Sequence, residues 1–278
     1  MTRGPLPEGR NLPQASGRVG SASLLVGPAG LLLLFIVLPL IALVWRALSA
    51  PAFLTALGSR LVVDALRLTA VTTTWTLMLV VAGGTPLAFL LARRSFAGKR
   101  LVEIAVDFPL VLPPVVAGVA LLMAFGRRGL LGQGLELFGI ELPFTTAAVV
   151  MAQLFVAGPF YIRGARLGFA AVDPAVEEAA AIDGASPFAG FRYVTLPLAL
   201  PGMASGAVLC LGRALSEFGA TLLFAGNLAG RTQTMSLAIN QALQSDLSAA
   251  LALSVLLVVA ATLVLVLSRA VFGGRLNV

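Results

Sequence analysis

Six stretches of the chain are almost entirely apolar, and shorter polar segments separate them. A helix rises about 1.5 Å per residue, so about 20 apolar residues cross the roughly 30 Å hydrocarbon core of a membrane. Each stretch is long enough to do so. They run over Leu24–Trp45, Leu66–Ala92, Leu101–Phe125, Thr145–Arg163, Pro201–Ala225 and Leu247–Leu267. The pattern predicts an all-α membrane protein, a bundle of six transmembrane helices.

The flanking segments are predicted to be simple. Residues 1–23 contain Pro5, Pro7 and Pro13 among glycines and serines, which predicts a flexible tail. The first apolar stretch exceeds the roughly 7–15 apolar residues of a signal peptide, and no small-residue cleavage site follows it. A retained helix is therefore favoured over a cleaved signal. Residues 24–270 are predicted to form one membrane domain, and residues 271–278 a short C-terminus.

Composition supports a membrane protein and excludes several other classes. Hydrophobic residues make up 59% of the 278 positions and charged residues 11%, whereas soluble domains have about 45–50% and about 25%. Histidine is absent and Cys210 is the only cysteine. A disulfide scaffold, a zinc site and histidine-based catalysis are thus excluded, and Cys210 is interpreted as a small buried apolar residue.

The basic residues predict how the chain is oriented. They lie at the ends of the spans rather than on one basic face, which argues against nucleic-acid binding. About twice as many fall on the side of the N-terminal tail as on the other side, and Arg93, Arg94, Lys99 and Arg100 form the densest group. By the positive-inside rule this side is cytoplasmic. We expect a multi-pass protein of the cell membrane with both termini in the cytoplasm.

The longest polar connection, from Arg163 to Leu200, has clear local signals. Asp173-Pro174 and Ser186-Pro187 are each typical of an N-cap followed by the first residue of a helix. Gly184 between them suits a helix stop. We predict two short helices joined at a sharp corner, the second ending near Tyr193. Such a hairpin either covers the ends of the spans or serves as a docking knob.

Motifs in this loop resemble a known family. Glu178-Ala179-Ala180, then Gly184, then Val194-x-Leu196-Pro197 resembles the EAA loop of type I ABC-importer permeases, with Val194 in place of the usual Ile. Further segments resemble the molybdate-type permeases, which are akin to the sulfate and tungstate permeases. These segments are Pro109–Val116, Phe125–Leu130, Arg213–Thr221, where Ser216 replaces a Gly, and Phe224–Thr234.

The resemblance implies a function and a set of partners. The protein would form the pore for an oxyanion, with molybdate favoured and sulfate or tungstate as alternatives. Two copies of an ATPase subunit, a second permease copy and an extracytoplasmic binding protein would complete the transporter, and no cofactor is implied. In the family the loop inserts into the ATPase subunit. Glu178 would make the polar contact, and Phe188 would fill the groove. The backbones would approach closely at the small residues Ala179, Ala180, Gly184 and Ala185.

The chain itself lacks an ATP site. A phosphate-binding loop of the form Gly-x-x-x-x-Gly-Lys-Ser/Thr needs a lysine. Lys99 is the only one, Arg100 follows it, and Arg93 stands where the first glycine belongs. The chain is therefore not an ATPase, and ATP hydrolysis must come from another polypeptide.

Charged residues inside the spans are candidates for function, because each costs several kcal/mol in a membrane. Arg213 and Glu217 lie four residues apart and are predicted to pair. The pair either fixes helix packing or lines a path for an anion together with Ser216, Gly219 and Thr221. Asp107 makes the third span unusually polar. A secondary transporter is a weaker alternative because it would need unpaired carboxylates or a histidine, and no polar cluster points to a membrane enzyme.

Overall fold

The computed structural model describes residues 19–272, and side chains from 26 to 267. These residues contain helices and no strands, which confirms the all-α class. The chain divides into two units, residues 1–46 and 47–278, and the first contains most of α1 (Val19–Leu48). The predicted tail 1–23 and C-terminus 271–278 lie largely outside the described residues. Within the predicted tail, α1 already begins at Val19.

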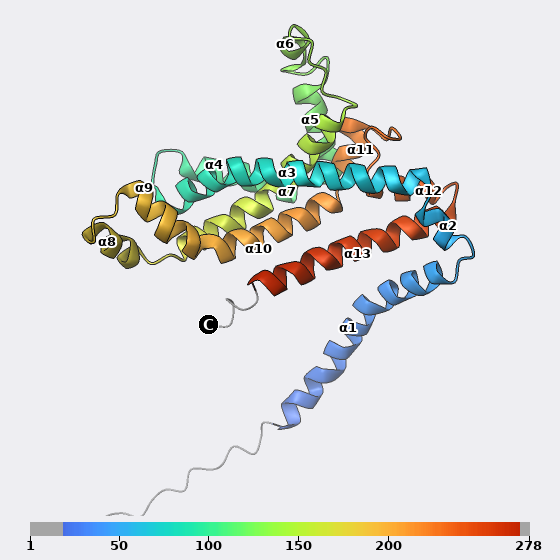
Figure 1. The fold of residues 1–278 in the computed structure, drawn as a ribbon, viewed down its shortest axis with the longest axis horizontal. Helices are drawn as coiled ribbons and strands as arrows, with labels where there is room; N and C mark the ends of the chain where they lie inside the picture. Colours follow the sequence, from blue (N-terminus) through green and yellow to red (C-terminus); the bar gives the residue numbers. More distant parts are fainter. Residues whose placement is uncertain (1–18, 273–278) are drawn as a thin grey trace, which may run out of the picture. The chain divides into compact units, whose positions relative to one another are not determined.

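In the second unit, four long helices lie side by side (Figure 1). They are α3 (Arg60–Arg93), α7 (Thr146–Ala170), α10 (Leu196–Leu215) and α13 (Leu247–Phe272). Shorter helices connect them. These are α2 (Phe53–Leu57), α4 (Lys99–Val111), α5 (Pro114–Phe125), α6 (Gly132–Glu136), α8 (Pro174–Ile182), α9 (Pro187–Gly190), the π-helical turn η1 (Phe191–Thr195), α11 (Gly219–Ala225) and α12 (Met235–Ala242).

Five helical segments of the described chain are long and apolar enough to cross a membrane. They are Val26–Leu48, Arg60–Arg93, Thr146–Ala170, Pro187–Leu215 and Leu247–Leu267. The prediction of one continuous helix over Leu101–Phe125 is wrong, because the chain breaks between α4 and α5. Leu112 precedes Pro113 and adopts an extended backbone, as a residue before proline prefers to do. The signal was present in the sequence as Leu112-Pro113-Pro114.

The predicted boundaries of the fifth span are also wrong. The helix runs from Pro187 through η1 to Leu215, and residues 219–225 form the separate helix α11. The second loop helix therefore does not end near Tyr193. It continues into the span through a π-helical turn, which accommodates Pro197, a residue without an N–H to donate. Arg163 and Arg166, predicted to lie in the loop, belong to α7, which ends at Ala170.

Helices α7 and α10 touch backbone to backbone. Each carries two glycines four residues apart, Gly164 and Gly168 on α7 and Gly202 and Gly206 on α10. A Cβ on Gly164 would lie 2.5 Å from the Cα of Gly206, and one on Gly168 would lie 2.6 Å from the carbonyl oxygen of Ala199. Small residues at this spacing let membrane helices approach closely. The loop between these helices is thus the tip of a tight helical hairpin.

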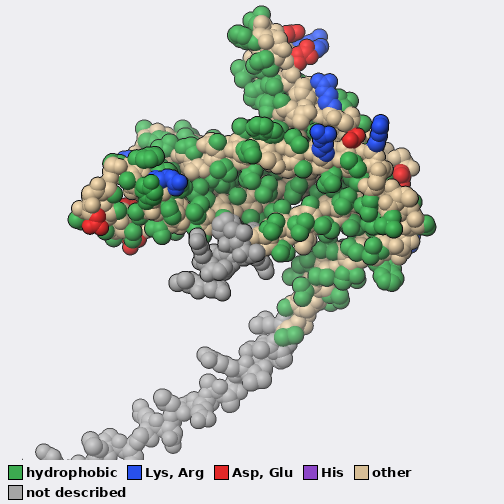
Figure 2. Space-filling model, in the orientation of Figure 1, with side chains coloured by type: hydrophobic (Ala, Val, Ile, Leu, Met, Phe, Trp, Pro, Cys, Tyr) green, Lys and Arg blue, Asp and Glu red, His purple; other side chains and the backbone are tan. Residues whose placement is uncertain are grey.

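Hydrophobic side chains cover most of the long helices on the face shown in Figure 2. Charged side chains gather at the α8 end and near the short helices α5, α6, α11 and α12. Exposed apolar residues include Trp75 and Leu79 on α3, and Val259 and Leu263 on α13. This distribution is what a protein surrounded by lipid requires, with polar groups at the two ends of the helices.

The glycine contact between α7 and α10 leads to a prediction. Gly164→Ala should destabilise the protein by about 1–3 kcal/mol, because the added methyl group meets backbone that cannot move aside. Gly158→Ala on the same helix is the control, since its Cβ would meet only a methyl group of Val80 at an ordinary 3.7 Å. Thermal unfolding of both variants in detergent measures the difference. Equal stability of the two variants would contradict the contact.

Candidate functional site

The local structure of the loop follows from its sequence. The Asp173 side chain accepts a hydrogen bond from the Ala175 N–H at 2.9 Å, and Ser186 Oγ accepts one from the Ala189 N–H at 3.2 Å. Gly184 has a φ of +89°, and its N–H donates to the Ala181 carbonyl. The next N–H, of Ala185, reaches the Ala180 carbonyl, which completes a Schellman stop. Both predicted caps and the corner at Gly184 are confirmed.

The tip of the loop presents apolar side chains to the outside. Ile182 is 85% exposed, and Phe188 and Tyr193 are each 75% exposed. Of the predicted docking residues, Glu178, Ala179, Gly184 and Phe188 are exposed, while Ala180 and Ala185 are half-buried. We call Ile182, Gly184 and Phe188, with Glu178 and Ala179, the tip surface. The sequence did not single out Ile182, although it lies two residues before the predicted corner at Gly184.

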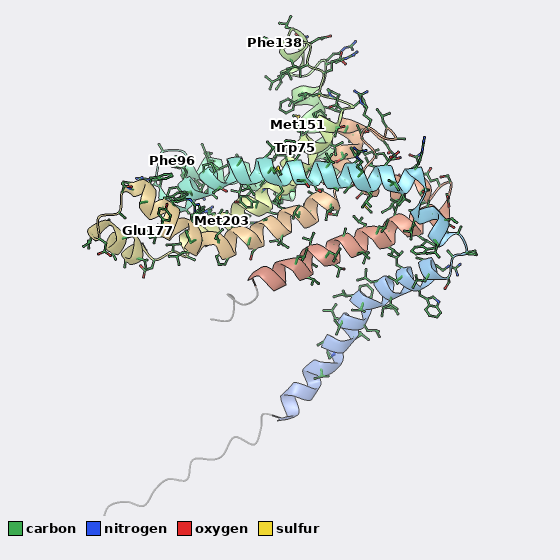
Figure 3. All side chains as sticks on the ribbon, viewed as in Figure 1. Trp75, Phe96, Phe138, Met151, Glu177 and Met203 are labelled. Carbon is green, nitrogen blue, oxygen red and sulfur yellow. The ribbon has the colours of Figure 1, made fainter. Side chains whose placement is uncertain are left out.

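The opposite side of α8 is tied to the long helices. Glu177 Oε1 accepts a hydrogen bond from Thr195 Oγ1 at 2.5 Å and lies 3.2 Å from Nη2 of Arg93, in the last turn of α3. The same Nη2 donates to the Val172 carbonyl at 2.8 Å. Figure 3 shows Glu177 where the loop meets the ends of the long helices. The two neighbouring glutamates thus have different surroundings: Glu177 contacts other parts of the protein, whereas Glu178 is exposed.

A second polar centre lies where α10 ends and α11 begins. Glu217 is 1% exposed, and its carboxylate forms an ion pair with Arg213 at 2.7 Å, as predicted. Its other oxygen accepts a hydrogen bond from the Ala220 N–H at 2.8 Å. The arginine therefore sits at the negative end of α10 and the carboxylate at the positive end of α11, so each charge is favoured by a helix dipole.

The other candidate pore residues surround this break. Gly219 and Thr221 are buried in α11, whereas Ser216 is exposed and Arg213 is partly accessible. Two carbonyls in the last turn of α10 receive side-chain donors. Gln153 of α7 donates to Ala214 at 3.3 Å and accepts from Thr76 of α3 at 2.9 Å. Ser236 likewise donates to the Leu215 carbonyl at 3.2 Å. A broken helix within a membrane needs such partners for its backbone.

The polar residues of α4 are paired with α7. Glu103 lies 2.8 Å from Arg166, and Asp107 lies 3.5 Å from Arg163. These pairs account for the polarity of the segment around Asp107, because each carboxylate meets an arginine one helix away. Their spacing also explains why α4 lies along the C-terminal half of α7.

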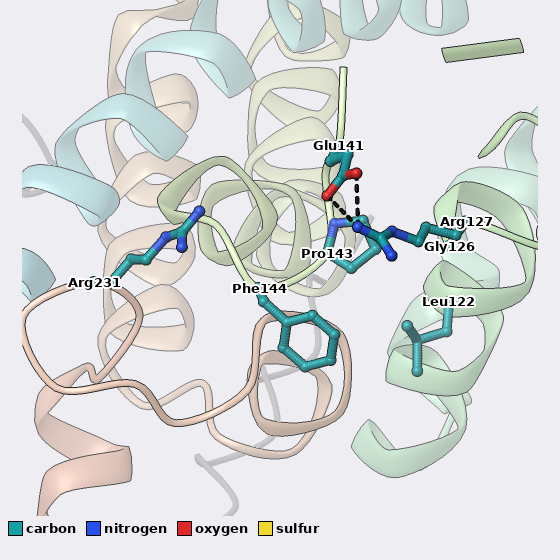
Figure 4. A pocket seen from close by; sticks show the side chains of 7 residues that line it. All are labelled: Leu122, Gly126, Arg127, Glu141, Pro143, Phe144 and Arg231. Atoms are coloured by element: carbon teal, nitrogen blue, oxygen red, sulfur yellow. Dashed lines mark hydrogen bonds and ion pairs between the residues drawn. The ribbon is translucent and has the colours of Figure 1, made fainter. Parts of the chain in front are cut away.

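A cavity of about 420 Å³ lies at the other end of α7, beyond its N-terminus. Arg127 donates from Nη2 to both carboxylate oxygens of Glu141, at 2.7 and 2.8 Å, and Arg231 lies across the cavity (Figure 4). The hydrogen bond to Glu141 raises the pKa of Arg127, so this arginine stays charged. Phe144 between them has a φ of 62°, uncommon for a bulky side chain.

No cluster of metal ligands exists among the residues whose structure is described. Cys210 lies buried in α10, as the sequence predicted, in the apolar core that joins α3, α7 and α10.

The comparisons with known proteins agree with this architecture. The profile of the binding-protein-dependent transport system inner membrane component family matches residues 84–277. That range covers α7, the loop and α10. The chain belongs to this family.

Relatives that match this chain are named as permeases for molybdenum, which is more specific than the family's description. The molybdenum transport system permease protein ModB of Mycobacterium tuberculosis is 44% identical over 232 residues, which are 84% of this chain and 88% of the relative. Its namesake in Escherichia coli K12 is 42% identical over 159 residues, 57% of this chain and 69% of the relative. The predicted resemblance to ABC-importer permeases, molybdate-type in particular, is confirmed.

Solved structures show the same fold. A bacterial ABC transporter that imports the acidic polysaccharide alginate aligns with a TM-score of 0.75 at 18% identity, over 92% of this chain and 96% of the other. At that identity the likeness concerns the fold alone.

The buried ion pair leads to a prediction. Glu217→Gln should destabilise the inner membrane component by about 3–5 kcal/mol, because Arg213 would remain charged beside a neutral partner. Glu136→Gln, on the exposed helix α6, is the control and should have little effect. Thermal unfolding in detergent measures both variants. If they unfold at the same temperature, Glu217 does not hold the break between α10 and α11.

Proposed function

We propose that this chain is the membrane subunit of an ATP-driven importer, and that its substrate is molybdate. The observation that carries the proposal is the exposed tip surface at the end of the α7–α10 hairpin. A membrane subunit without its own ATP site needs a surface that binds an ATPase subunit and receives its movement. The relatives' shared name, molybdenum transport system permease protein, supports molybdate as the substrate.

The tip surface would dock into a groove on the ATPase subunit, one loop to each of two subunits. Phe188 and Ile182 supply large apolar anchors, of the kind that dominate binding energy at interfaces. Glu178 would add the polar contact, and Ala179, Ala180, Gly184 and Ala185 would let the backbones approach. Closure of the ATPase subunits around ATP would draw two such loops together and switch the pore.

The segment α4–α5 would be the sixth crossing of the membrane, broken at Pro113. Glu103 pairs with Arg166 near the C-terminal end of α7, whereas Gly126 lines the cavity with Phe144 just before its N-terminal end. The two ends of the segment are therefore at opposite ends of α7. Six crossings would put both termini on the side of the loop, which the arginine distribution makes cytoplasmic.

A second copy of the chain would complete the pore. The arm made of α5, α6 and the turns that flank α6 projects from the long helices in Figure 1, and its turns expose large apolar side chains. Leu130 is 91% exposed, Leu137 86% and Phe138 81%. Apolar surface on a projecting arm is typical of contact with another subunit. Arg213 and Ser216, the accessible residues at the helix break, would face the path between two copies, while Glu217, Gly219 and Thr221 would support it from inside.

The cavity with Arg127 and Arg231 would face the extracytoplasmic binding protein. It lies beyond the N-terminus of α7, whereas the tip surface follows the C-terminus of the same helix. With 25 residues, α7 is about 37 Å long, so the two sites lie at opposite ends of it. With the loop in the cytoplasm, the cavity is outside. Arg231 would attract an anion released by the binding protein, since Arg127 is already paired with Glu141.

Uptake assays test the function. The chain, purified from its native membrane in mild detergent, should bring an ATPase subunit with it, and the reconstituted complex with the binding protein should take up molybdate only with ATP. Competition by sulfate and tungstate measures the selectivity of molybdate uptake. If either anion is itself taken up more strongly than molybdate, that anion is the substrate instead. Uptake driven by a proton or sodium gradient alone would contradict an ATP-driven importer.

The docking residues have their own test. Phe188→Asp and Ile182→Asp should each weaken binding of the ATPase subunit by at least about 2 kcal/mol, roughly thirtyfold in Kd, because a charge enters an apolar contact. Leu54→Asp is the matched control, since Leu54 is 79% exposed but lies on α2, at the other end of the helices. Titration of the purified permease with ATPase subunit measures all three. Unchanged binding by both loop variants would exclude the tip surface as the docking site.

A further inference from the structure

The contacts of Glu177 suggest a role different from docking. Its carboxylate oxygen Oε1 is the meeting point of three segments, namely Arg93 at the end of α3, Thr195 at the start of the α10 span, and α8 itself. Arg93 also donates a hydrogen bond to the Val172 carbonyl, in the segment that connects α7 to α8. Thr195 is 3% exposed, the Arg93 side chain 16% and the Glu177 side chain 31%, so these contacts are partly shielded from water.

An aromatic cluster lies directly beside this polar contact. Phe89, one helical turn before Arg93, packs edge-on against Phe169 of α7 with ring centroids 5.3 Å apart, and against Phe191 of η1 at 5.0 Å. Phe169 and Phe191 are 6.3 Å apart. The ends of α3, α7 and the α10 span are therefore packed into one unit, and Glu177 is the residue of α8 that joins it by charge and hydrogen bond.

The rest of α8 has little else to hold it. None of the nine residues Pro174–Ile182 is fully buried, and the corner at Gly184 has open space around it. A force on the α8 part of the tip surface (Glu178, Ala179 and Ile182) would tilt α8 unless a contact passed it to the long helices. Phe188, by contrast, lies on the helical segment that continues into α10. The internal contacts of Glu177 are the charged link between α8 and the helices that cross the membrane.

We propose that the Arg93–Glu177–Thr195 contact transmits the movement of the loop to α3 and α10, and that Glu177 is a positioning residue. This inference rests on the proposed function. It separates the two neighbouring glutamates, since Glu178 meets the ATPase subunit and Glu177 converts that contact into movement of the helices. Loss of Glu177 should uncouple transport from ATP hydrolysis without preventing assembly.

Charge reversal in the assembled transporter tests this role. In proteoliposomes containing the permease, ATPase subunit and binding protein, Glu177→Arg should lower the molybdate transported per ATP at least about tenfold, while co-purification of the ATPase subunit is kept. The double variant Arg93→Glu with Glu177→Arg restores the ion pair in the opposite sense, though not the hydrogen bond to the Val172 carbonyl, and should recover part of the loss. Arg94→Glu is the matched control, since Arg94 is adjacent and exposed.

Milder variants keep the test decisive if Glu177→Arg fails to assemble. Glu177→Gln and Thr195→Val remove only the charge or the hydroxyl donor, and each should lower transport per ATP by about threefold or more. Wild-type transport per ATP in both would overturn the inference, as would a double reversal no better than Glu177→Arg alone. Failure of the wild-type chain to bind any ATPase subunit would instead count against the proposed function.

Discussion

The close contact between α7 and α10 is the constraint on which the rest of the protein depends. Two pairs of glycines let the helix backbones meet, and a single methyl group at Gly164 would collide with Gly206. Because these helices follow one another in the chain, the loop between them is held at the tip of a rigid hairpin. In the proposed function, the loop would receive a force at its exposed tip and pass it to the long helices through the contacts of Glu177.

The membrane imposes the second constraint, since a break in a helix there must find partners for its polar groups. At the end of α10 the pair Arg213–Glu217 spans the break, and Gln153 and Ser236 donate hydrogen bonds to the Ala214 and Leu215 carbonyls. The helices α7 and α10 are thus closely packed near the loop, while the far end of α10 is interrupted and polar.

Much of this organisation was predictable from local sequence. The caps at Asp173 and Ser186 and the corner at Gly184 each depend on neighbouring residues, and all three are confirmed. The break at Leu112 and the glycine spacing of α7 and α10 are also visible as local signals, but they lie inside stretches whose length and apolarity predict uninterrupted spans. The ion pair of Arg213 with Glu217 was predicted correctly because its members are four residues apart.

By itself, the sequence determined the helical class, the apolar stretches that contain the long helices, the loop and its corner, and the absence of an ATP-binding motif, because each depends on residue type or short spacing. Only the tertiary structure decided which of two adjacent glutamates faces inward. That outcome depends on Arg93, far away in the chain, and on the closeness of α3, α7 and α10. Contacts between residues remote in sequence are set by packing, and packing follows from the whole chain.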